Sequence, residues 1–175
     1  MLADRRQVNV GSSCGLCGRP TIESLMTGVM LPPASGTISA ATLAAIPEAL
    51  RARQVGFDAT GGLHAAGLFD VDGRLVAIAE DVGRHNAVDK VVGRMLMREA
   101  LPLSDRLLCV SGRASFEIVQ KAIFAGIPLV AAVSAPSSLA IGLAEEAWVT
   151  LVGFARGDSF NIYAHAARIA RADPR

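Results

Sequence analysis

The sequence predicts an α/β protein, a three-layer sandwich of helices around a mixed sheet. From about residue 63 to residue 154, short apolar runs of strand length alternate with segments of helical periodicity. An Asp-Gly turn joins the first two runs as a hairpin, which we place at one side of the parallel strands. The chain of 175 residues is 51% hydrophobic, enough to bury a core without cross-links. We expect one domain, with a loop-rich segment over residues 1–36 and an α/β core over 37–175.

The first predicted elements are one helix and the hairpin. The helix covers Thr42 to Val55, and Pro47 marks a break or a new start in it. After a Gly-Gly pair the pattern changes to two strands, Leu63 to Asp70 and Arg74 to Glu80, joined by the turn Asp70-Val71-Asp72-Gly73.

Helices and strands then alternate along the rest of the core. Apolar residues at helical spacing predict the helices, and short apolar runs predict buried strands. The predicted helices are Asn86 to Glu99, Phe116 to Ala125 and Ser138 to Ala147; the predicted strands are Leu107 to Val110, Leu129 to Val133 and Val149 to Phe154.

Charge and cysteine content narrow the class of protein. The formal net charge is +1, so no bulk basic field favours nucleic acid as a partner. No apolar run is long enough to span a membrane, and residues 1–10 show no signal-peptide pattern. The odd number of cysteines, three, favours a reducing compartment. We therefore expect a cytoplasmic protein without a membrane or nucleic-acid partner.

Polar loops follow the predicted strands, and we expect them to meet at the carboxyl edge of the sheet, where ligands bind. They are residues 80–86, 111–115 and 134–138. Helix N-termini at this edge attract phosphate, and Arg84 and Arg113 add forked donors. A further cluster, Phe154-Ala155-Arg156-Gly157-Asp158-Ser159, follows the last predicted strand and pairs a cation with an acid. Serines that cap helices and glycines that permit turns are the alternative explanation. No loop has the P-loop spacing or a dinucleotide GxGxxG.

The thiols of Cys14-Gly15-Leu16-Cys17-Gly18 can bind a metal, cycle as a disulfide or carry a persulfide. Structural zinc usually needs four ligands, and the chain adds only Cys109 and three scattered histidines, His64, His85 and His165. Cys109 lies in an apolar strand, where a buried, inert thiol is expected. A thioredoxin-type pair belongs at a strand–helix junction, whereas this pair precedes the α/β part in a Gly-Ser stretch. An accessible thiol in such a stretch suits sulfur transfer.

Four motifs together resemble the FdhD family of sulfur carrier proteins for maturation of molybdenum-dependent formate dehydrogenase. They are the CxxC above, the segment EDVGRHNAVDK from Glu80 to Lys90, the segment SGRASFE from Ser111 to Glu117, and GFARGD from Gly153 to Asp158. The resemblance runs from about Cys14 to His165, and the segment from Glu80 to Lys90 is its most specific part.

The resemblance implies a role for each motif. A cysteine desulfurase would load sulfur on Cys14 as a persulfide, with Cys17 assisting. The sulfur would pass to the molybdenum cofactor, the bis-molybdopterin guanine dinucleotide, which GDP or GTP would mimic. The stretch Gly153, Phe154, Ala155, Arg156, Gly157 and Asp158 corresponds to the family's cofactor-contacting segment. Formate dehydrogenase is the implied target, and a homodimer the implied assembly.

Residues around the first loop complete the predicted site. We expect Asp81 and His85 to orient the cofactor, with Arg84 and Arg113 beside them, and no metal ligand among them. The alternative is that Asp81 caps the following helix and that His85 packs against its neighbours.

The resemblance also implies a core similar to the cytidine deaminase fold. The deaminase catalytic set is missing, because Ala65 and Ala66 follow His64 and no PCxxC occurs downstream. Family members usually carry a longer segment before the CxxC, so the chain is expected to lack the family's N-terminal part. Two alternative functions stay open: a molybdenum cofactor chaperone without sulfur transfer, and a zinc-stabilised binding domain.

Overall fold

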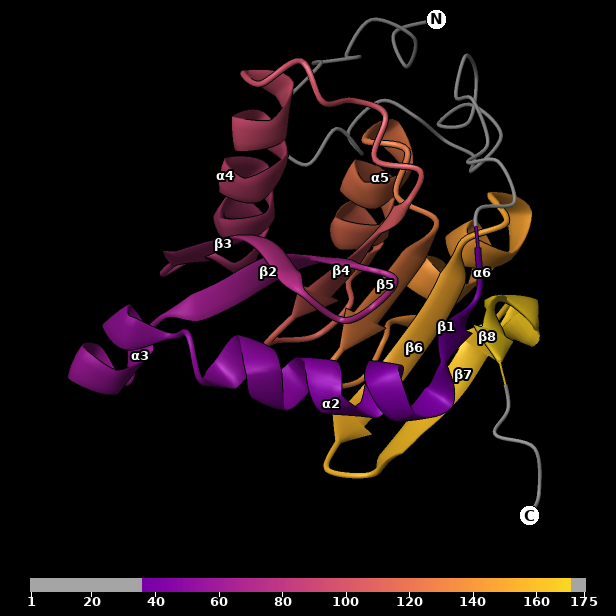
Figure 1. Ribbon diagram of the computed structural model, residues 1–175, viewed down its shortest axis with the longest axis horizontal. Coiled ribbons are helices and arrows are strands. Elements are labelled where there is room, and N and C mark those ends of the chain that lie inside the picture. Colours follow the sequence, from indigo (N-terminus) through magenta and orange to yellow (C-terminus); the bar gives the residue numbers. More distant parts are fainter. Residues whose placement is uncertain (1–35, 171–175) are drawn as a thin grey trace, which may run out of the picture.

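The computed structural model describes residues 36–170, which form a six-stranded sheet covered by helices and a separate two-stranded sheet (Figure 1). The order of strands in the larger sheet is β3-β2-β4-β5-β6-β7. Its strands are β2 (His64–Asp70), β3 (Leu75–Asp81), β4 (Arg106–Val110), β5 (Leu129–Ala132), β6 (Thr150–Arg156) and β7 (Ser159–Ala164).

The sheet is mixed, as predicted. The pairs β4–β5 and β5–β6 are parallel, whereas the hairpin β2–β3 joins β4 in antiparallel fashion at one side. β7 returns antiparallel to β6 and forms the other edge. Because β3 and β4 are each antiparallel to β2, they run in the same direction as each other. β5 and β6 are parallel to β4, so the carboxyl ends of β3, β4, β5 and β6 all lie at the same edge of the sheet.

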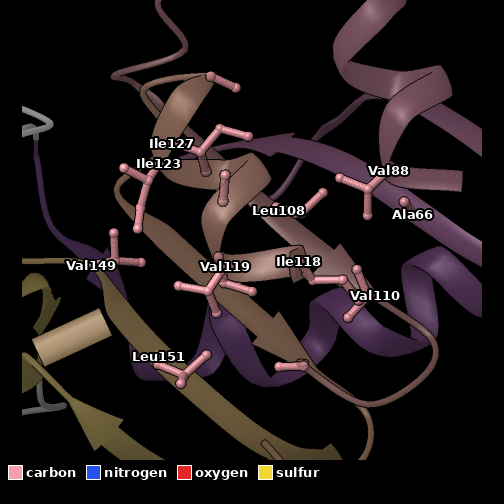
Figure 2. Close-up of a cluster of buried hydrophobic side chains, with 14 of the residues drawn as sticks. Ala66, Val88, Leu108, Val110, Ile118, Val119, Ile123, Ile127, Val149 and Leu151 are labelled. Atoms are coloured by element: carbon pink, nitrogen blue, oxygen red, sulfur yellow. The ribbon is translucent and has the colours of Figure 1, made fainter. Parts of the chain in front are cut away.

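Helices cover both faces of the sheet and make three layers. The helices α4 (Arg84–Leu96), α5 (Phe116–Phe124) and α6 (Ser138–Glu146) share one buried cluster with residues of the sheet, and Figure 2 shows part of it. Helix α2 (Ala40–Arg51) packs on the opposite face, where its Leu43, Ile46 and Leu50 share a second cluster with other strand residues. Alternate residues of one strand enter different clusters, since successive side chains point to opposite faces. In β4, for example, Leu108 belongs to the first cluster and Cys109 to the second.

The first helix differs from its prediction at both ends. Helix α2 begins after Ser39, whose Oγ accepts a hydrogen bond from the Thr42 amide at 3.0 Å, as an N-cap does. It passes through the buried Pro47 and ends at Arg51. Pro47 is therefore neither a break nor a new start; burial of the apolar face compensates for the hydrogen bond that proline cannot donate. Helix α3 (Val55–Thr60) is a separate short helix after Gln54.

Strand β6 is longer than predicted. It runs to Arg156, and Gly157, with a φ of 53°, turns the chain into β7. Residues 154–156 therefore belong to the strand, instead of a loop that follows it. The sequence pattern also missed β7, the 3₁₀ turn Ala166–Arg168 and the small parallel sheet of β1 (Ile38–Ser39) and β8 (Ile169–Ala170).

Two predictions concern residues outside the described range. Cys14 and Cys17 lie there, as does nearly all of the loop-rich segment over residues 1–36. Within residues 36–170, no helix has the length and apolar character needed to cross a membrane.

Candidate functional site

The loops after β4 and β5 lie together at the carboxyl edge of the sheet. The amide of Ser134 donates to the carbonyl of Gly112 at 3.3 Å, and the amide of Ser137 donates to that of Ala114 at 3.0 Å. The Oγ of Ser137 accepts from the Ala140 amide and caps α6, so this serine has the structural role of the alternative explanation. These bonds make a fixed platform from two of the three predicted loops.

A cavity of about 470 Å³ lies between this edge and the helices α2 and α3. Its volume is in the range of small-molecule sites. The cavity, which we call the edge cavity, is lined by Pro47, Glu48, Leu50, Arg51, Gln54, Phe57, Gly61, Gly62, Leu63, His64, Ser111, Val133, Ala155, Arg156 and Gly157. Apolar walls with a few polar groups that fix the orientation of a ligand are typical of small-molecule sites.

Two guanidinium groups line the edge cavity, and their surroundings differ. Arg51 forms an ion pair with Asp58 at 2.7 Å and lies over the ring of Phe57, 4.9 Å from its centroid. Arg156 donates from Nε to the carbonyl of Val133 at 2.9 Å. Its terminal nitrogens make no hydrogen bond to any of residues 36–170. Arg156 can therefore offer two forked donors to an anion without losing a hydrogen bond to residues 36–170.

Close backbone packing places Arg156 at the cavity. A Cβ on Gly153 would lie 2.7 Å from Cδ of Pro136, so only glycine permits this approach. The next amide, of Phe154, donates to the carbonyl of Ser134 at 3.2 Å. Of the predicted stretch from Gly153 to Asp158, Ala155, Arg156 and Gly157 line the cavity; Gly153, Phe154 and Asp158 do not.

Asp81 organises the loop between β3 and α4. Its carboxylate accepts from the Gly83 amide at 2.9 Å, from Asn86 Nδ2 at 3.1 Å and from Lys90 Nζ at 2.5 Å. We call these four residues the clasp. The bond from Lys90, with those from Gly83 and Asn86, lowers the pKa of Asp81 to about 2. The N-cap position of α4 is occupied by Gly83, so Asp81 holds the start of the helix from two residues earlier.

His85 lies beside the clasp in a polar cluster with the start of α5. Its Nε2 is 3.0 Å from Ser115 Oγ and 3.5 Å from a carboxylate oxygen of Glu117. Burial, aided by the positive charge of Arg84, lowers the pKa of His85 and favours the neutral ring at pH 7. Ser115 occupies the N-cap position of α5 without making the side-chain cap bond, so its hydroxyl is used on His85 instead.

The two predicted arginines of the loops do not line the edge cavity. Arg113 is exposed. The Nε of Arg84 is buried and has no hydrogen-bond partner in the described part of the chain. Thus Asp81, Arg84, His85 and Arg113 gather near the same edge as Arg156 but outside the walls of the cavity.

Cys109 is fully buried in β4, and this burial raises its pKa to about 12. The prediction of a buried thiol is confirmed, and such a thiol does not form a nucleophilic thiolate at neutral pH. Among residues 36–170, no group of three or more histidine, cysteine, aspartate and glutamate side chains is placed to hold a metal ion.

The wall of the cavity formed by α2 and α3 was not predicted from the sequence. Glu48, Arg51, Gln54 and Phe57 line it, yet none belongs to a recognisable motif. His64, at the start of β2, is half-buried and also lines the cavity. The sequence feature that could have indicated this wall is the Gly61-Gly62 pair. It connects α3 to β2 and lines the cavity.

The fold and the cavity define a class: an α/β protein with a ligand-sized site at the carboxyl edge of a mixed sheet. Within that class, the chain belongs to the FdhD/NarQ family, whose model matches residues 2–170.

Several relatives support this assignment. The chain is 58% identical over 160 residues to the sulfur carrier protein FdhD of Mycolicibacterium paratuberculosis, covering 90% of this chain and 59% of the relative. It is 57% identical over 168 residues to the sulfur carrier protein FdhD of Streptomyces coelicolor, covering 94% of this chain and 60% of that relative. It is 48% identical to the sulfur carrier protein FdhD of Sulfolobus acidocaldarius, covering 95% of this chain and 64% of that relative. The chain therefore spans about three-fifths of the length of these relatives.

A solved structure has a similar fold. It is a putative formate dehydrogenase accessory protein from Desulfotalea psychrophila, with a TM-score of 0.73 and 32% identity. The similarity covers 79% of this chain and 59% of that one. An α/β fold with a mixed sheet is thus common to both, whereas likeness to the cytidine deaminase fold stays a prediction.

Proposed function

We propose that the chain carries sulfur from a cysteine desulfurase to the molybdenum cofactor that formate dehydrogenase requires. Membership of the FdhD/NarQ family and the names of the relatives support a sulfur carrier. The observation within the structure that carries the proposal is the edge cavity with Arg156 in its wall. A dinucleotide cofactor needs such a site for its ring and phosphates, and the protein would hold it there as a substrate.

Cys14 and Cys17 supply the sulfur chemistry in this proposal. The thiolate of Cys14 attacks the outer sulfur of the desulfurase persulfide; that S–S bond breaks and the donor leaves as a thiolate. The thiolate of Cys17 then attacks Sγ of Cys14, forming the Cys14–Cys17 disulfide and releasing the outer sulfur as hydrosulfide. The two cysteines thereby supply the two electrons that reduce the sulfur, and a dithiol reductant regenerates them.

The residues at the sheet edge would hold the cofactor. Arg156, with Ala155 and Gly157 in the cavity wall and Gly153, Phe154 and Asp158 next to them, forms the proposed phosphate end of the site. Arg84 and Arg113 would add positive charge from the neighbouring loops. Asp81 and His85 would orient the cofactor through the loop that the clasp holds.

Persulfide mapping tests the proposal. The chain is incubated with a cysteine desulfurase and cysteine, and the sulfur added to each thiol is located by mass spectrometry. Wild type and Cys109→Ala should gain cyanide-labile sulfur on Cys14, whereas Cys14→Ser should lose it, because Cys109 is buried and protonated. Sulfur found on Cys109 with Cys14 unmodified contradicts the assignment.

A cofactor chaperone without sulfur transfer is the second candidate. The observation that favours it is that, among residues 36–170, the residues that line the edge cavity include no cysteine. A chain that binds GDP and activates formate dehydrogenase, but gains no persulfide, would be such a chaperone. A zinc-stabilised domain predicts instead stoichiometric zinc in the purified protein. The desulfurase, the dehydrogenase and a second copy of the chain are the proposed partners.

A further inference from the structure

Gln54 is a buried polar residue in the wall of the edge cavity. It is 3% exposed and, with Thr150, is one of two buried polar residues within residues 36–170. The hydroxyl of Thr150 donates to the carbonyl of His165 at 2.7 Å. The side-chain amide of Gln54, in contrast, makes no hydrogen bond to a described residue, although it follows α2 and occupies the N-cap position of α3.

The amide of Gln54 has donors and an acceptor that a ligand could use. A side-chain amide has two donors and an acceptor with two lone pairs. Because Gln54 lines a cavity of about 470 Å³ and makes no side-chain hydrogen bond to residues 36–170, a bound molecule can pair with this amide.

The backbone around Gln54 is held in place. Its amide donates to the carbonyl of Arg51 at 3.2 Å, and its carbonyl accepts from the Asp58 amide at 3.0 Å. Glu80 then receives the next two free amides of α3, from Gly56 at 2.7 Å and Phe57 at 2.8 Å. Because the backbone is fixed in this way, only the side chain of Gln54 needs to be ordered when a ligand binds.

We propose that Gln54 reads the ring edge of the bound cofactor through paired hydrogen bonds, a role that rests on the proposed function. A side-chain amide presents a donor and an acceptor side by side. The complementary pair is a cyclic lactam, whose C=O accepts and whose neighbouring N–H donates. Guanine and pterin share this lactam, and the proposed substrate contains both rings. The apolar walls, including Leu50, Phe57 and Leu63, cover the faces of such a ring, while Arg156 takes the phosphate.

Ligands that separate ring from phosphate test the proposal. Calorimetry measures the binding of GDP, neopterin and ribose 5-phosphate to the full chain and to Gln54→Leu. The variant should bind the ring-bearing ligand about tenfold more weakly, the size expected for a paired contact. Its affinity for ribose 5-phosphate, which has no ring, should not change. Loss confined to GDP identifies guanine as the ring, and loss confined to neopterin identifies the pterin.

A matched control and a direct readout complete the test. Gln120→Leu makes the same chemical change in α5, on the other face of the sheet, and should bind like wild type. In the wild-type chain, the side-chain NH₂ signals of Gln54 should shift in NMR spectra when the ring ligand is added, which needs no variant to fold.

Three results would overturn the proposal: equal losses for all three ligands, no binding of GDP or neopterin by wild type, or unshifted Gln54 signals at saturation. Persulfide formation on Cys14 is measured separately, so failure of the ring contact is distinct from failure of sulfur transfer.

Discussion

The edge cavity and the clasp lie at the same edge of the sheet but use their polar groups in opposite ways. In the clasp, the carboxylate of Asp81 is bonded to three protein donors. In the cavity, the amide of Gln54 and the terminal nitrogens of Arg156 have no partner among residues 36–170. Polar groups that satisfy one another fix a backbone, whereas groups left over at a cavity are available to a ligand.

One sequence segment, at the end of β3, contributes to both the edge cavity and the clasp. Glu80 and Asp81 are neighbours at the end of β3, and successive side chains of a strand point to opposite faces. Glu80 reaches the first turn of α3 beside the cavity, and Asp81 holds the first turn of α4. The segment most specific to the family therefore acts mainly as a frame around a site whose lining comes from elsewhere.

Removal of the Arg156 guanidinium should have the largest effect on binding. Arg156→Ala should weaken GDP binding by roughly tenfold or more, the range of a hydrogen bond to a charged group. The loss should be larger at low salt, because salt screens a phosphate contact. Calorimetry at two salt concentrations measures this. Arg98→Ala removes an exposed arginine of the α4–β4 connection and serves as the charge control. Unchanged affinity in Arg156→Ala would contradict the assignment of the phosphate to Arg156.

Removal of the Glu80 carboxylate, which holds the first turn of α3, should have an intermediate effect on binding. Glu80→Ala leaves the amides of Gly56 and Phe57 without their acceptor, which should cost about 1 kcal/mol of stability, as the loss of a helix cap does. Hydrogen exchange at these two amides should become faster, and GDP affinity should fall severalfold as the wall moves. Glu80→Gln keeps one acceptor and should recover part of both losses. If exchange accelerates while affinity stays constant, α3 does not shape the site.

Changing the clasp should affect stability most and should have the smallest effect on binding. The pKa of Asp81 is lowered from 3.8 to about 2, so its stabilising effect is fully present above pH 3.8 and is lost as the pH falls toward 2. Asp81→Asn should therefore lower Tm most at pH 5–7, and the gap to wild type should narrow between pH 4 and pH 2. GDP affinity at pH 7 should fall less than in Glu80→Ala, because Asp81 acts on the cofactor only through the loop that it holds. Weaker binding with an unchanged Tm would instead indicate that Asp81 contacts the cofactor.

Local patterns predicted the core of the fold well. The Asp-Gly turn and the alternating strands and helices gave the hairpin, the parallel strands and helices α4, α5 and α6 close to their observed positions. Tertiary contacts decided the rest. Pro47 continues a helix because that face is buried, and β7 forms because Gly157 turns the chain back on β6. Phe160 and Ile162 alternate with polar residues in β7, a pattern too short to distinguish from a loop.

The site was predicted only in part, for a related reason. Arg156 belongs to a recognisable motif and lies at the end of a strand, and both facts indicated the correct edge of the sheet. Gln54 and Phe57 precede the sheet in sequence and reach the cavity only when α2 and α3 fold over its face. Their proximity to Arg156 arises from topology, and no spacing along the chain encodes it.

The small sheet of β1 and β8 has a mechanical consequence. It pairs Ile38 with Ile169 and Ser39 with Ala170, and its two strands run in the same direction. Force applied to residue 36 against residue 170 would pull these strands past each other, so their hydrogen bonds and the buried Ile38 and Ile169 would be loaded together. Resistance to such a pull depends on the barrier to unfolding. The small sheet thus resists separation of residues 36 and 170. Ile38 and Ile169 must both leave the core before such a force can pull on helix α2.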